Sequence, residues 1–537
     1  MTFRFVALAV SFSLLYGAAL TNLYRVQIMR GAAYIERAEA RQAEREELRL
    51  RRGQIFFADR AGTNIPVALQ RDYPVVYAAP NEIVDPAGTA RSIAPLLGAP
   101  ADELTSIFAD EKSKFALLAD RASTELTNAV SKLALPGIYT NKKKQYRSYP
   151  FEVLAAPLIG FVGVNRDHPT PAGLYGLEKL HDASLARGED FATTIDRNLQ
   201  ATAEQMIGKL IDRYRATGGA VLIAEPATGK LLAMASLPSF DPNDYSAAPV
   251  GRYDNPTVQY VYEPGSVMKP LTISAGIDAG AITPETTYVD SGSVTLNGWT
   301  IKNFKDEVYN TISMTNVLEH SVNTGAVFAE RALGHERFHD YLMKFGLGAK
   351  TGVDLPDEVA GSLKNIERTS VRAVDFATAA YGQGVAVTPI QLIAAYGALA
   401  NGGLLMRPYL SADAKPAVVR RVLAEATAKT VTGMLESAVR VNNVAVISGY
   451  RVAGKTGTAY IPDFVKGGYT DEFIHTFIGY APTSDPKFVI LVKLERPALG
   501  ETAGVTVVPA FRELAQFVLN YYRIPPDNVP AASNAKQ

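Results

Sequence analysis

The stretch that decides the fold reads Tyr-Glu-Pro-Gly-Ser-Val-Met-Lys-Pro over residues 262–270. Pro264-Gly265 is a turn signal, and the apolar spacing after it predicts a helix as far as Gly280. Ser266 is then expected at a helix start, where backbone N–H groups are free and the helix dipole favours negative charge. Lys269 lies three residues on and shares a helix face with Ser266. A Ser hydroxyl attacks once a base takes its proton, and Lys can be that base if burial or a second cation lowers its pKa.

The Ser-x-x-Lys spacing is not specific by itself. It occurs three times, at Ser266/Lys269, at Ser484/Lys487 in a turn between strand-like runs, and at Ser533/Lys536 in the polar tail. Only the first copy has a turn followed by a helical pattern. On spacing alone, the competing interpretation is that Ser266 merely caps its helix.

A second polar motif, Ser321-Val322-Asn323, follows the helical stretch 314–320. Ser and Asn two residues apart at a helix end can point into one cleft. The hydroxyl can relay a proton and the amide can hold a substrate amide. The alternative is an ordinary polar helix end. If the flanking pair faces the cleft, Val322 faces away from the chemistry.

A third motif, Lys455-Thr456-Gly457-Thr458, is typical of an edge strand that lines a cleft. Glycine allows a ligand close to the backbone, Lys supplies a charge for a carboxylate, and Thr hydroxyls donate to it. The alternative is a plain exposed edge strand. A second Lys-Thr-Gly at 350–352 follows turn-like glycines and is predicted to be a loop without chemistry.

Strand-like runs lie at both ends of the second half of the chain. Residues 220–224 and 230–235 flank a turn, and residues 476–480 and 488–492 repeat that pattern. A long helical stretch, 266–435, separates the two pairs, and a further helix is predicted over 508–522. We therefore expect an α+β fold with one sheet built from strands of both ends.

Composition excludes several classes of function. The 537 residues contain 54 Lys+Arg and 54 Asp+Glu, and this lack of net charge argues against a nucleic-acid binder. Cysteine is absent, which excludes disulfides, thiolate zinc sites and cysteine nucleophiles. The six His residues are scattered. We expect no metal and no cofactor.

The amino terminus carries an uncharged run of 20 residues, Phe5 to Tyr24. At ~1.5 Å per residue a helix of this length crosses a bilayer core, so a membrane anchor is predicted. A cleaved signal peptide ending near Gly17-Ala18-Ala19 and a buried core helix are the alternatives. Residues 31–52 are predicted to form a charged helix. Residues 53–196 are predicted to form a mixed α+β region with short apolar strands, such as one over residues 73–77.

The three motifs, in this order, resemble those of class B penicillin-binding proteins, the monofunctional peptidoglycan D,D-transpeptidases. Further stretches look like the family's pedestal and transpeptidase landmarks: Arg52-Gly53-Gln54-Ile55 with Asp59-Arg60-Ala61-Gly62, Arg147-Ser148-Tyr149-Pro150, Gly176-Leu177-Glu178, Thr194-Ile195-Asp196, and Tyr381-Gly382-Gln383-Gly384 with Thr388-Pro389.

The resemblance implies an N-terminal transmembrane helix (1–30), an elongated mixed α/β pedestal (31–195), a transpeptidase domain (196–525) and a disordered tail (526–537). The transpeptidase domain would have an antiparallel sheet flanked by helices and a large helical subdomain. The chain would cross the inner membrane once, with a short cytoplasmic start and its catalytic domain on the periplasmic or extracellular side.

The resemblance also implies the roles of the site residues. Ser266 would attack the penultimate D-Ala of a stem peptide, with Lys269 as general base. Ser321 and Asn323 would relay protons and hold the peptide. The segment Lys455 to Thr458, with Thr456 and Gly457, would bind the terminal carboxylate, and an amine of a neighbouring stem would take the acyl group. β-Lactams would acylate Ser266.

Several alternatives share the motifs. Septal division is favoured over side-wall elongation, and a β-lactam receptor or scaffold without turnover is a third possibility. A hydrolytic enzyme would need a base for water, and no Glu-x-x-Leu-Asn element stands between Asn323 and Lys455. A bifunctional enzyme would need a glycosyltransferase region, and residues 31–195 show none. The resemblance further implies a membrane glycosyltransferase as a partner, contacting the anchor and pedestal.

Overall fold

The computed structural model describes residues 16–17, 24, 51–164 and 171–527. Apart from Tyr16, Gly17 and Tyr24, the predicted membrane anchor lies outside these residues. So does the predicted charged helix except Arg51 and Arg52, which are not helical. Within the described part of the chain, no helix combines the length and apolar character that crossing a membrane requires.

The largest sheet is formed by strands from both ends of the second half of the chain, as the sequence predicts. Its order is β11-β10-β20-β19-β18, and every neighbouring pair is antiparallel. The strand β18 therefore lies at an edge. The bounds are β10 (Gly218–Ala224), β11 (Leu231–Leu237), β18 (Ala453–Pro462), β19 (Tyr469–Ala481) and β20 (Phe488–Glu495).

Helices cover both faces of this sheet, so β10 and β20 are buried except for Glu495 at the end of β20. Side chains alternate along β10: Val221 and Ile223 pack in one core cluster with α9 (Arg197–Tyr214) and α18 (Ala503–Tyr521). Leu222 belongs to the other cluster, with the helical subdomain. This two-residue period is the ordinary consequence of strand geometry.

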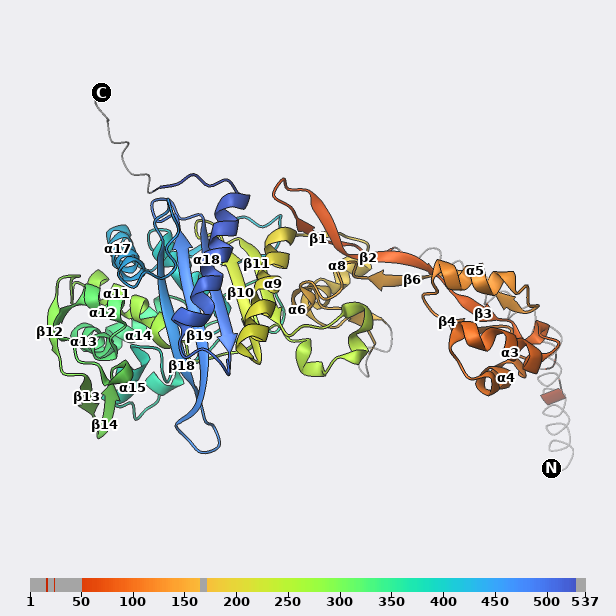
Figure 1. The fold of residues 1–537 in the computed structure, drawn as a ribbon, viewed down its shortest axis with the longest axis horizontal. Helices are drawn as coiled ribbons and strands as arrows, with labels where there is room; N and C mark the ends of the chain where they lie inside the picture. Colours follow the sequence, from red (N-terminus) through yellow and green to blue (C-terminus); the bar gives the residue numbers. More distant parts are fainter. Residues whose placement is uncertain (1–15, 18–23, 25–50, 165–170, 528–537) are drawn as a thin grey trace, which may run out of the picture.

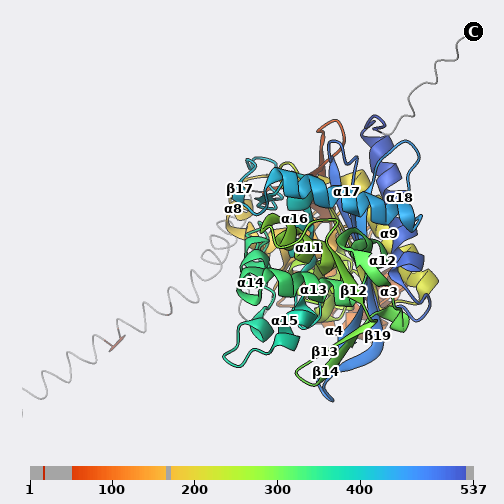
Figure 2. The same ribbon diagram turned by 90° about the vertical axis from the view of Figure 1, so that its left-hand side faces the viewer.

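The helical subdomain holds the second half's remaining helices and three two-stranded sheets. Figure 2 shows α17 lying across α11, α12 and α16. Its helices are α10 (Pro256–Gln259), α11 (Lys269–Asp278), α12 (Met314–His320), α13 (Asn323–Leu333), α14 (His335–Lys344), α15 (Ala373–Ala379), α16 (Pro389–Ala400) and α17 (Glu425–Val441). The paired strands are β12 (Thr287–Asp290) with β15 (Asn310–Ser313), β13 (Ser293–Leu296) with β14 (Trp299–Lys302), and β16 (Leu404–Met406) with β17 (Val418–Arg421).

The first half of the chain is elongated and ends in a distal lobe (Figure 1). A sheet of order β6-β2-β1-β9 links this lobe to the rest. The lobe has its own apolar core and a sheet of order β4-β3-β5. The linking strands are β1 (Ile55–Ala58), β2 (Asn64–Pro74), β6 (Lys143–Ser148) and β9 (Phe191–Asp196). The lobe contains β3 (Val76–Ala78), β4 (Ala116–Ala119), β5 (Ile138–Tyr139), α3 (Pro86–Leu97), α4 (Ala101–Phe108) and α5 (Thr124–Lys132).

A buried ion-pair network joins the pedestal motifs noted in the sequence. Glu178 is fully buried and accepts hydrogen bonds from Arg52 at 2.7 Å and from Arg147 at 2.5 Å. Burying a carboxylate is tolerated when it is paired and hydrogen-bonded in this way. The surrounding short elements are α6 (Ala156–Ile159), β7 (Val162–Gly163), β8 (Ala172–Gly173), α7 (Gly176–Leu180) and α8 (Asp182–Ala186).

Three sequence expectations need correction. The single strand over residues 73–77 is wrong: β2 ends at Pro74 and β3 begins at Val76, in different sheets, because proline lacks the N–H that a continuing ladder needs. The helix expected over 508–522 begins at Ala503. The tail expected from residue 526 starts too early, since Asp527 accepts hydrogen bonds from Arg451 and Ser484.

Candidate active site

Ser266 lies on a tight turn at the start of α11. A single 3-10 turn, Gly265–Met268, precedes the helix, where the sequence predicts a helix directly from Ser266. The N–H of Gly265 donates to the carbonyl of Gly382 at 3.0 Å. The segment around Gly382, one of the family-like stretches named in the sequence analysis, therefore holds the turn that carries Ser266.

Lys269 is the first residue of α11 and is fully buried. Its Nζ donates to the Ser321 backbone oxygen, and to Ser321 Oγ at 3.2 Å. Burial, and secondly the charge of Lys455, hold the pKa of Lys269 well below the usual range of a lysine. A neutral amine at this position can accept a proton.

Ser321 joins two helices. It follows the last residue of α12 in a left-handed conformation (φ 59°), and α13 begins at Asn323. Val322 between them is buried (1% exposed). Asn323 Nδ2 donates to the carbonyl of Lys302 at 2.9 Å, which ties this motif to the cleft wall.

Lys455 reaches the same hydroxyl from the edge strand β18. Its Nζ donates to Ser321 Oγ at 2.9 Å. Burial lowers the pKa of Lys455 to about 7. Two lysine amines thus meet at one serine, and a charge on either disfavours a charge on the other.

Gly457 lets β18 approach the turn that carries Ser266. A Cβ at Gly457 would lie 2.9 Å from the Pro264 carbonyl oxygen and 3.1 Å from Val267 Cγ1. A side chain here would push the strand and the turn apart. The glycine of this motif therefore has a packing reason that the sequence alone leaves open.

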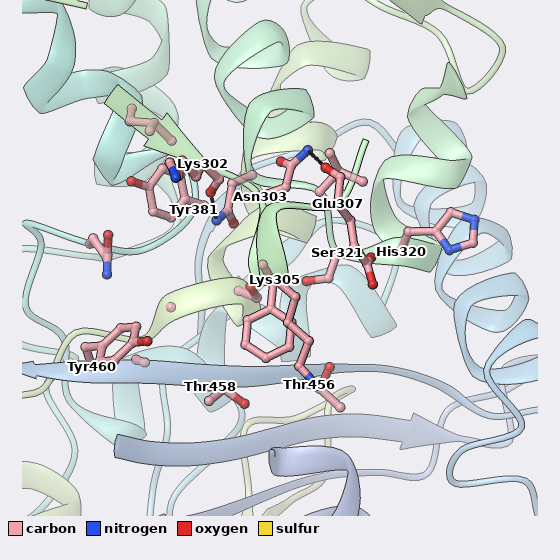
Figure 3. Close-up of a pocket in the computed structure, with 18 of the residues that line it drawn as sticks. Lys302, Asn303, Lys305, Glu307, His320, Ser321, Tyr381, Thr456, Thr458 and Tyr460 are labelled. Atoms are coloured by element: carbon pink, nitrogen blue, oxygen red, sulfur yellow. Dashed lines mark hydrogen bonds between the residues drawn. The ribbon is translucent and has the colours of Figure 1, made fainter. Parts of the chain in front are cut away.

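Most of these groups border one cleft of about 1240 Å³, and Lys269 and Gly457 lie behind its lining residues. Figure 3 shows Thr456, Thr458 and Tyr460 along β18 on one side, with Asn303 and Glu307 on the facing side. Further lining residues named in the sequence analysis are Ser266, Ser321, Asn323 and Lys455. The structure thus brings together the three motifs that the sequence places far apart.

A buried polar network behind the cleft was missed by sequence reasoning. Asp290, at the end of β12, accepts hydrogen bonds from Asn303 Nδ2 at 3.0 Å and from Thr324 Oγ1 at 2.6 Å. No local sequence pattern predicts a contact among three residues this far apart in the chain. The Asn297-Gly298 turn signal would, however, have indicated the hairpin that carries Asn303 into place.

The other motif copies lie elsewhere. Residues 350–352 form a loop, where the Thr351 N–H donates to Glu358 at 2.7 Å. Ser484 lies in a turn and donates to Asp527 at 2.7 Å, while Ser533 is outside the described residues. Nor, in the described ranges, do three or more His, Cys, Asp or Glu side chains gather where they could hold a metal ion.

Comparison with known proteins identifies the family. A model described as the penicillin binding protein transpeptidase domain matches residues 219–516. Stage V sporulation protein D of Bacillus subtilis is 30% identical over 90% of this chain and 81% of its own length. Peptidoglycan D,D-transpeptidase FtsI of Escherichia coli is 28% identical over 98% of this chain and 93% of its own.

A solved structure shares the fold. The apo crystal structure of penicillin-binding protein 3 from Mycobacterium tuberculosis has a TM-score of 0.65 and 30% sequence identity, over 72% of this chain and 92% of that one. The family model covers nearly all of the central sheet, with Lys455 on β18, and the helical subdomain that holds Ser266 and Ser321. This chain belongs to the family of penicillin-binding proteins that carry a transpeptidase domain.

Proposed function

We propose that this chain is a peptidoglycan D,D-transpeptidase that cross-links stem peptides through a serine acyl-enzyme. One observation carries the proposal: the fully buried Lys269 amine and the Lys455 amine both donate to Ser321 Oγ, in the cleft that Ser266 lines. This arrangement offers a nucleophile, a base with a lowered pKa and a cation within one site, which is what acyl transfer by serine needs.

In the acylation step, Ser266 Oγ attacks the carbonyl of the penultimate D-Ala, and neutral Lys269 takes the hydroxyl proton. The C–N bond to the terminal D-Ala then breaks. The departing amine receives a proton, which Ser321 Oγ can relay because it contacts both lysine amines. Terminal D-Ala leaves, and the acyl group stays on Ser266 as an ester.

The substrate is held along β18. Lys455 supplies the positive charge for the terminal carboxylate, Thr456 and Thr458 supply hydroxyl donors, and Gly457 permits close approach. Asn323 holds the peptide amide from the opposite side. The backbone N–H groups of Ser266 and Thr458 stabilise the oxyanion, because an edge strand leaves half of its N–H groups free of ladder hydrogen bonds.

The second step mirrors the first. The amine of a neighbouring stem attacks the ester carbonyl, the C–O bond to Ser266 breaks, and the proton lost by the amine returns to the serine oxygen through Lys269 and Ser321. A new amide cross-link results. β-Lactams, which resemble the D-Ala-D-Ala end, acylate the same Ser266 oxygen.

Within this activity, we propose septal cell-wall synthesis as the physiological role of the enzyme. The similarity to Escherichia coli FtsI over almost the whole chain supports a division-type enzyme. Side-wall elongation by an enzyme of the same class is the alternative. A β-lactam receptor or scaffold without turnover is a second alternative, which shares the acylation chemistry but forms no cross-link.

The parts of the chain outside the transpeptidase domain would position the enzyme at the membrane. We propose residues 1–30 as a single-pass anchor in the inner membrane, 31–195 as the pedestal and 196 to about 527 as the transpeptidase domain, with the catalytic cleft on the periplasmic or extracellular side. A membrane glycosyltransferase that contacts the anchor and pedestal would supply new glycan strands. The elongated shape of the pedestal supports this arrangement (Figure 1).

Turnover of a defined donor and acceptor tests the proposed transpeptidase activity. The full-length chain is incubated with a donor stem peptide ending in D-Ala-D-Ala and a labelled amine acceptor, and D-Ala release and cross-linked product are quantified. We expect both in the wild-type chain and neither after Ser266→Ala. Penicillin acylation without any cross-link would identify a receptor, and D-Ala release without cross-link would identify a hydrolase.

A further inference from the structure

Large aromatic rings remain exposed around the mouth of the cleft. Trp299, the single Trp of the chain, lines the cleft from β14 and is 63% exposed. Phe304 on the same wall is 51% exposed, and Tyr460 and Tyr469 on the β18–β19 hairpin are each 43% exposed. Single exposed apolar side chains are normal, but several gathered at one cleft mark a binding surface.

The tight turn of the β13–β14 hairpin fixes the backbone position of Trp299. Asn297 and Gly298 form a two-residue turn with positive φ at both positions (50° and 81°), the geometry that closes tight hairpins. Asn297 Oδ1 accepts from the N–H of Val374 at 3.2 Å, which ties the turn to the start of α15. The indole is thus presented by a braced turn, so little ordering is needed when a ligand binds.

Most charged side chains near the rings already have a polar or charged partner. Lys305 lies 3.9 Å from Glu501, with its amine 5.5 Å from the centre of the Phe304 ring, and Glu307 accepts from the Tyr309 hydroxyl. Lys302 lies 3.1 Å from Asp306, and Arg372 lies 3.0 Å from Asp375, and all four line the cleft. A wall whose charges are neutralised locally offers no excess charge to an ionic ligand. It suits a neutral ligand that has apolar faces and hydroxyl groups.

We propose that this aromatic rim, formed by Trp299, Phe304, Tyr460 and Tyr469, binds sugar rings of the glycan strand that carries the stem peptide. The proposal rests on the proposed transpeptidase function. The C–H face of a pyranose packs on the negative face of an aromatic ring, and the sugar hydroxyls hydrogen-bond to the polar groups between the rings.

The length of the substrate agrees with this position. The stem peptide between the acylated carbonyl and the sugar is only a few residues long, and an extended chain spans at most about 3.6 Å per ordinary residue. The glycan must therefore follow the peptide closely into or onto the cleft. A volume of about 1240 Å³ also exceeds what the dipeptide end alone would fill.

The single Trp makes this contact directly measurable. Intrinsic indole emission of the full-length chain is recorded during titration with a disaccharide-pentapeptide, with the same pentapeptide lacking sugar, and with the disaccharide alone. We expect the sugar-bearing peptide to shift the emission of Trp299 to shorter wavelength, because a stacked sugar excludes water. The bare pentapeptide should leave the emission unchanged at matched occupancy of the site.

Variants give an independent measure. Trp299→Ala should raise KM for the sugar-bearing donor about three- to tenfold and leave both kcat and penicillin acylation unchanged. Trp299→Phe, which keeps a ring, should restore most of the affinity. Phe115→Ala is the matched control, since Phe115 directly precedes β4 of the distal lobe, is 49% exposed and does not line the cleft.

The outcomes separate this proposal from the proposed function. Equal effects of Trp299→Ala on the sugar-bearing and bare donors, or equal emission shifts from both, would overturn glycan binding while leaving transpeptidation intact. If no sugar changed the emission or the kinetics, glycan binding would likewise be overturned, and a protein would be the partner to test at the rim. Loss of penicillin acylation in the wild-type chain would instead refute the function on which the proposal rests.

Discussion

Asp290 and Thr324 are joined by a short hydrogen bond, in which the threonine hydroxyl donates to the carboxylate at 2.6 Å. Asp290 is only 1% exposed, and it also accepts from the backbone N–H of Tyr309 at 2.8 Å. Thr324 directly follows Asn323, and Tyr309 belongs to the segment that lines the cleft. One buried carboxylate therefore positions two walls of the site.

Removing that carboxylate should cost both stability and activity. Asp290→Ala leaves the N–H groups of Tyr309 and Gly292 without their side-chain acceptor. Thr324 Oγ1 and Asn303 Nδ2 each lose one acceptor and keep another. We expect the free energy of unfolding to fall by about 2–4 kcal/mol. We also expect slower penicillin acylation at temperatures well below the transition, since the cleft wall shifts. Thermal unfolding and the acylation rate measure the two effects.

The control is an exposed aspartate. Asp485 pairs with Lys487 at the surface, so Asp485→Ala should change the free energy of unfolding by less than about 0.5 kcal/mol. If Asp290→Ala behaved like Asp485→Ala, the network would have no positioning role.

The pH profile of acylation should show one limb for each lysine. Lys269 must be neutral to take a proton, and its lowered pKa places the acid limb far below the usual lysine range. Lys455 must be charged to hold a carboxylate. Its pKa of about 7 in the free enzyme means that the charge is lost as pH rises through 7, so kcat/KM for acylation should fall there.

Lys455→Arg tests the assignment of the alkaline limb. A guanidinium stays charged throughout this range, so the fall above pH 7 should disappear even if the overall rate is lower. Lys350→Arg, in the loop copy of the motif, should leave the rate and both limbs unchanged. An alkaline limb that survives in Lys455→Arg would belong to another group.

The turn that carries Ser266 should be sensitive to a glycine outside the three motifs. Gly382 has φ of +86°, and a Cβ there would lie 2.2 Å from the Gly265 carbonyl oxygen. Gly382→Ala should therefore displace the turn and slow acylation roughly ten- to hundredfold. Gly251→Ala, where no atom lies within 4 Å of the added Cβ, should be silent. Equal rates in the two variants would contradict this close contact.

Buried Glu204 should make stability depend on pH. Burial raises its pKa to about 7, although it accepts hydrogen bonds from Gln200 at 2.9 Å and from the Ala155 N–H at 2.7 Å. The folded state holds the proton more tightly than the unfolded state. This stabilisation is complete below the unfolded pKa of 4.5 and is lost as pH rises to about 7.

Glu204→Gln keeps an acceptor oxygen and cannot ionise. We expect it to equal the wild type near pH 4 and to exceed it at pH 8 by up to about 3 kcal/mol, measured by denaturant unfolding. Glu189→Gln, in an exposed pair with Arg187, is the control and should show no such crossover. A pH-independent difference for Glu204→Gln would mean that the carboxyl stays ionised in the folded protein.

Much of the catalytic half could be predicted from the sequence because its signals are local. The runs that became β10, β11, β19 and β20 are apolar and bounded by turns, and a short buried strand needs little more. The resemblance to penicillin-binding proteins placed the motifs of Ser266, Ser321 and Lys455 in one site, and the positions expected for them, two at helix ends and one on an edge strand, were compatible with it.

What the sequence could not supply depends on contacts between distant segments. In the sequence, Asp290 is an ordinary residue at a strand end, and nothing indicates its contacts with Thr324 and Asn303. Likewise, nothing local indicates that Gly382 contacts Gly265. The division of residues 73–77 between two sheets was missed because strand periodicity does not show which sheet a residue joins. Trp299 carried no signal either, since its exposure is a property of the folded hairpin.

The most direct test of the central claim is the identity of the acylated atom. The full-length chain is treated with a penicillin, its intact mass is measured, and the adduct is mapped by peptide sequencing. A single adduct on Ser266, nearly abolished by Lys269→Ala, is the predicted result. An adduct on any other residue, or acylation of Ser266 at the wild-type rate without the Lys269 amine, would contradict the account.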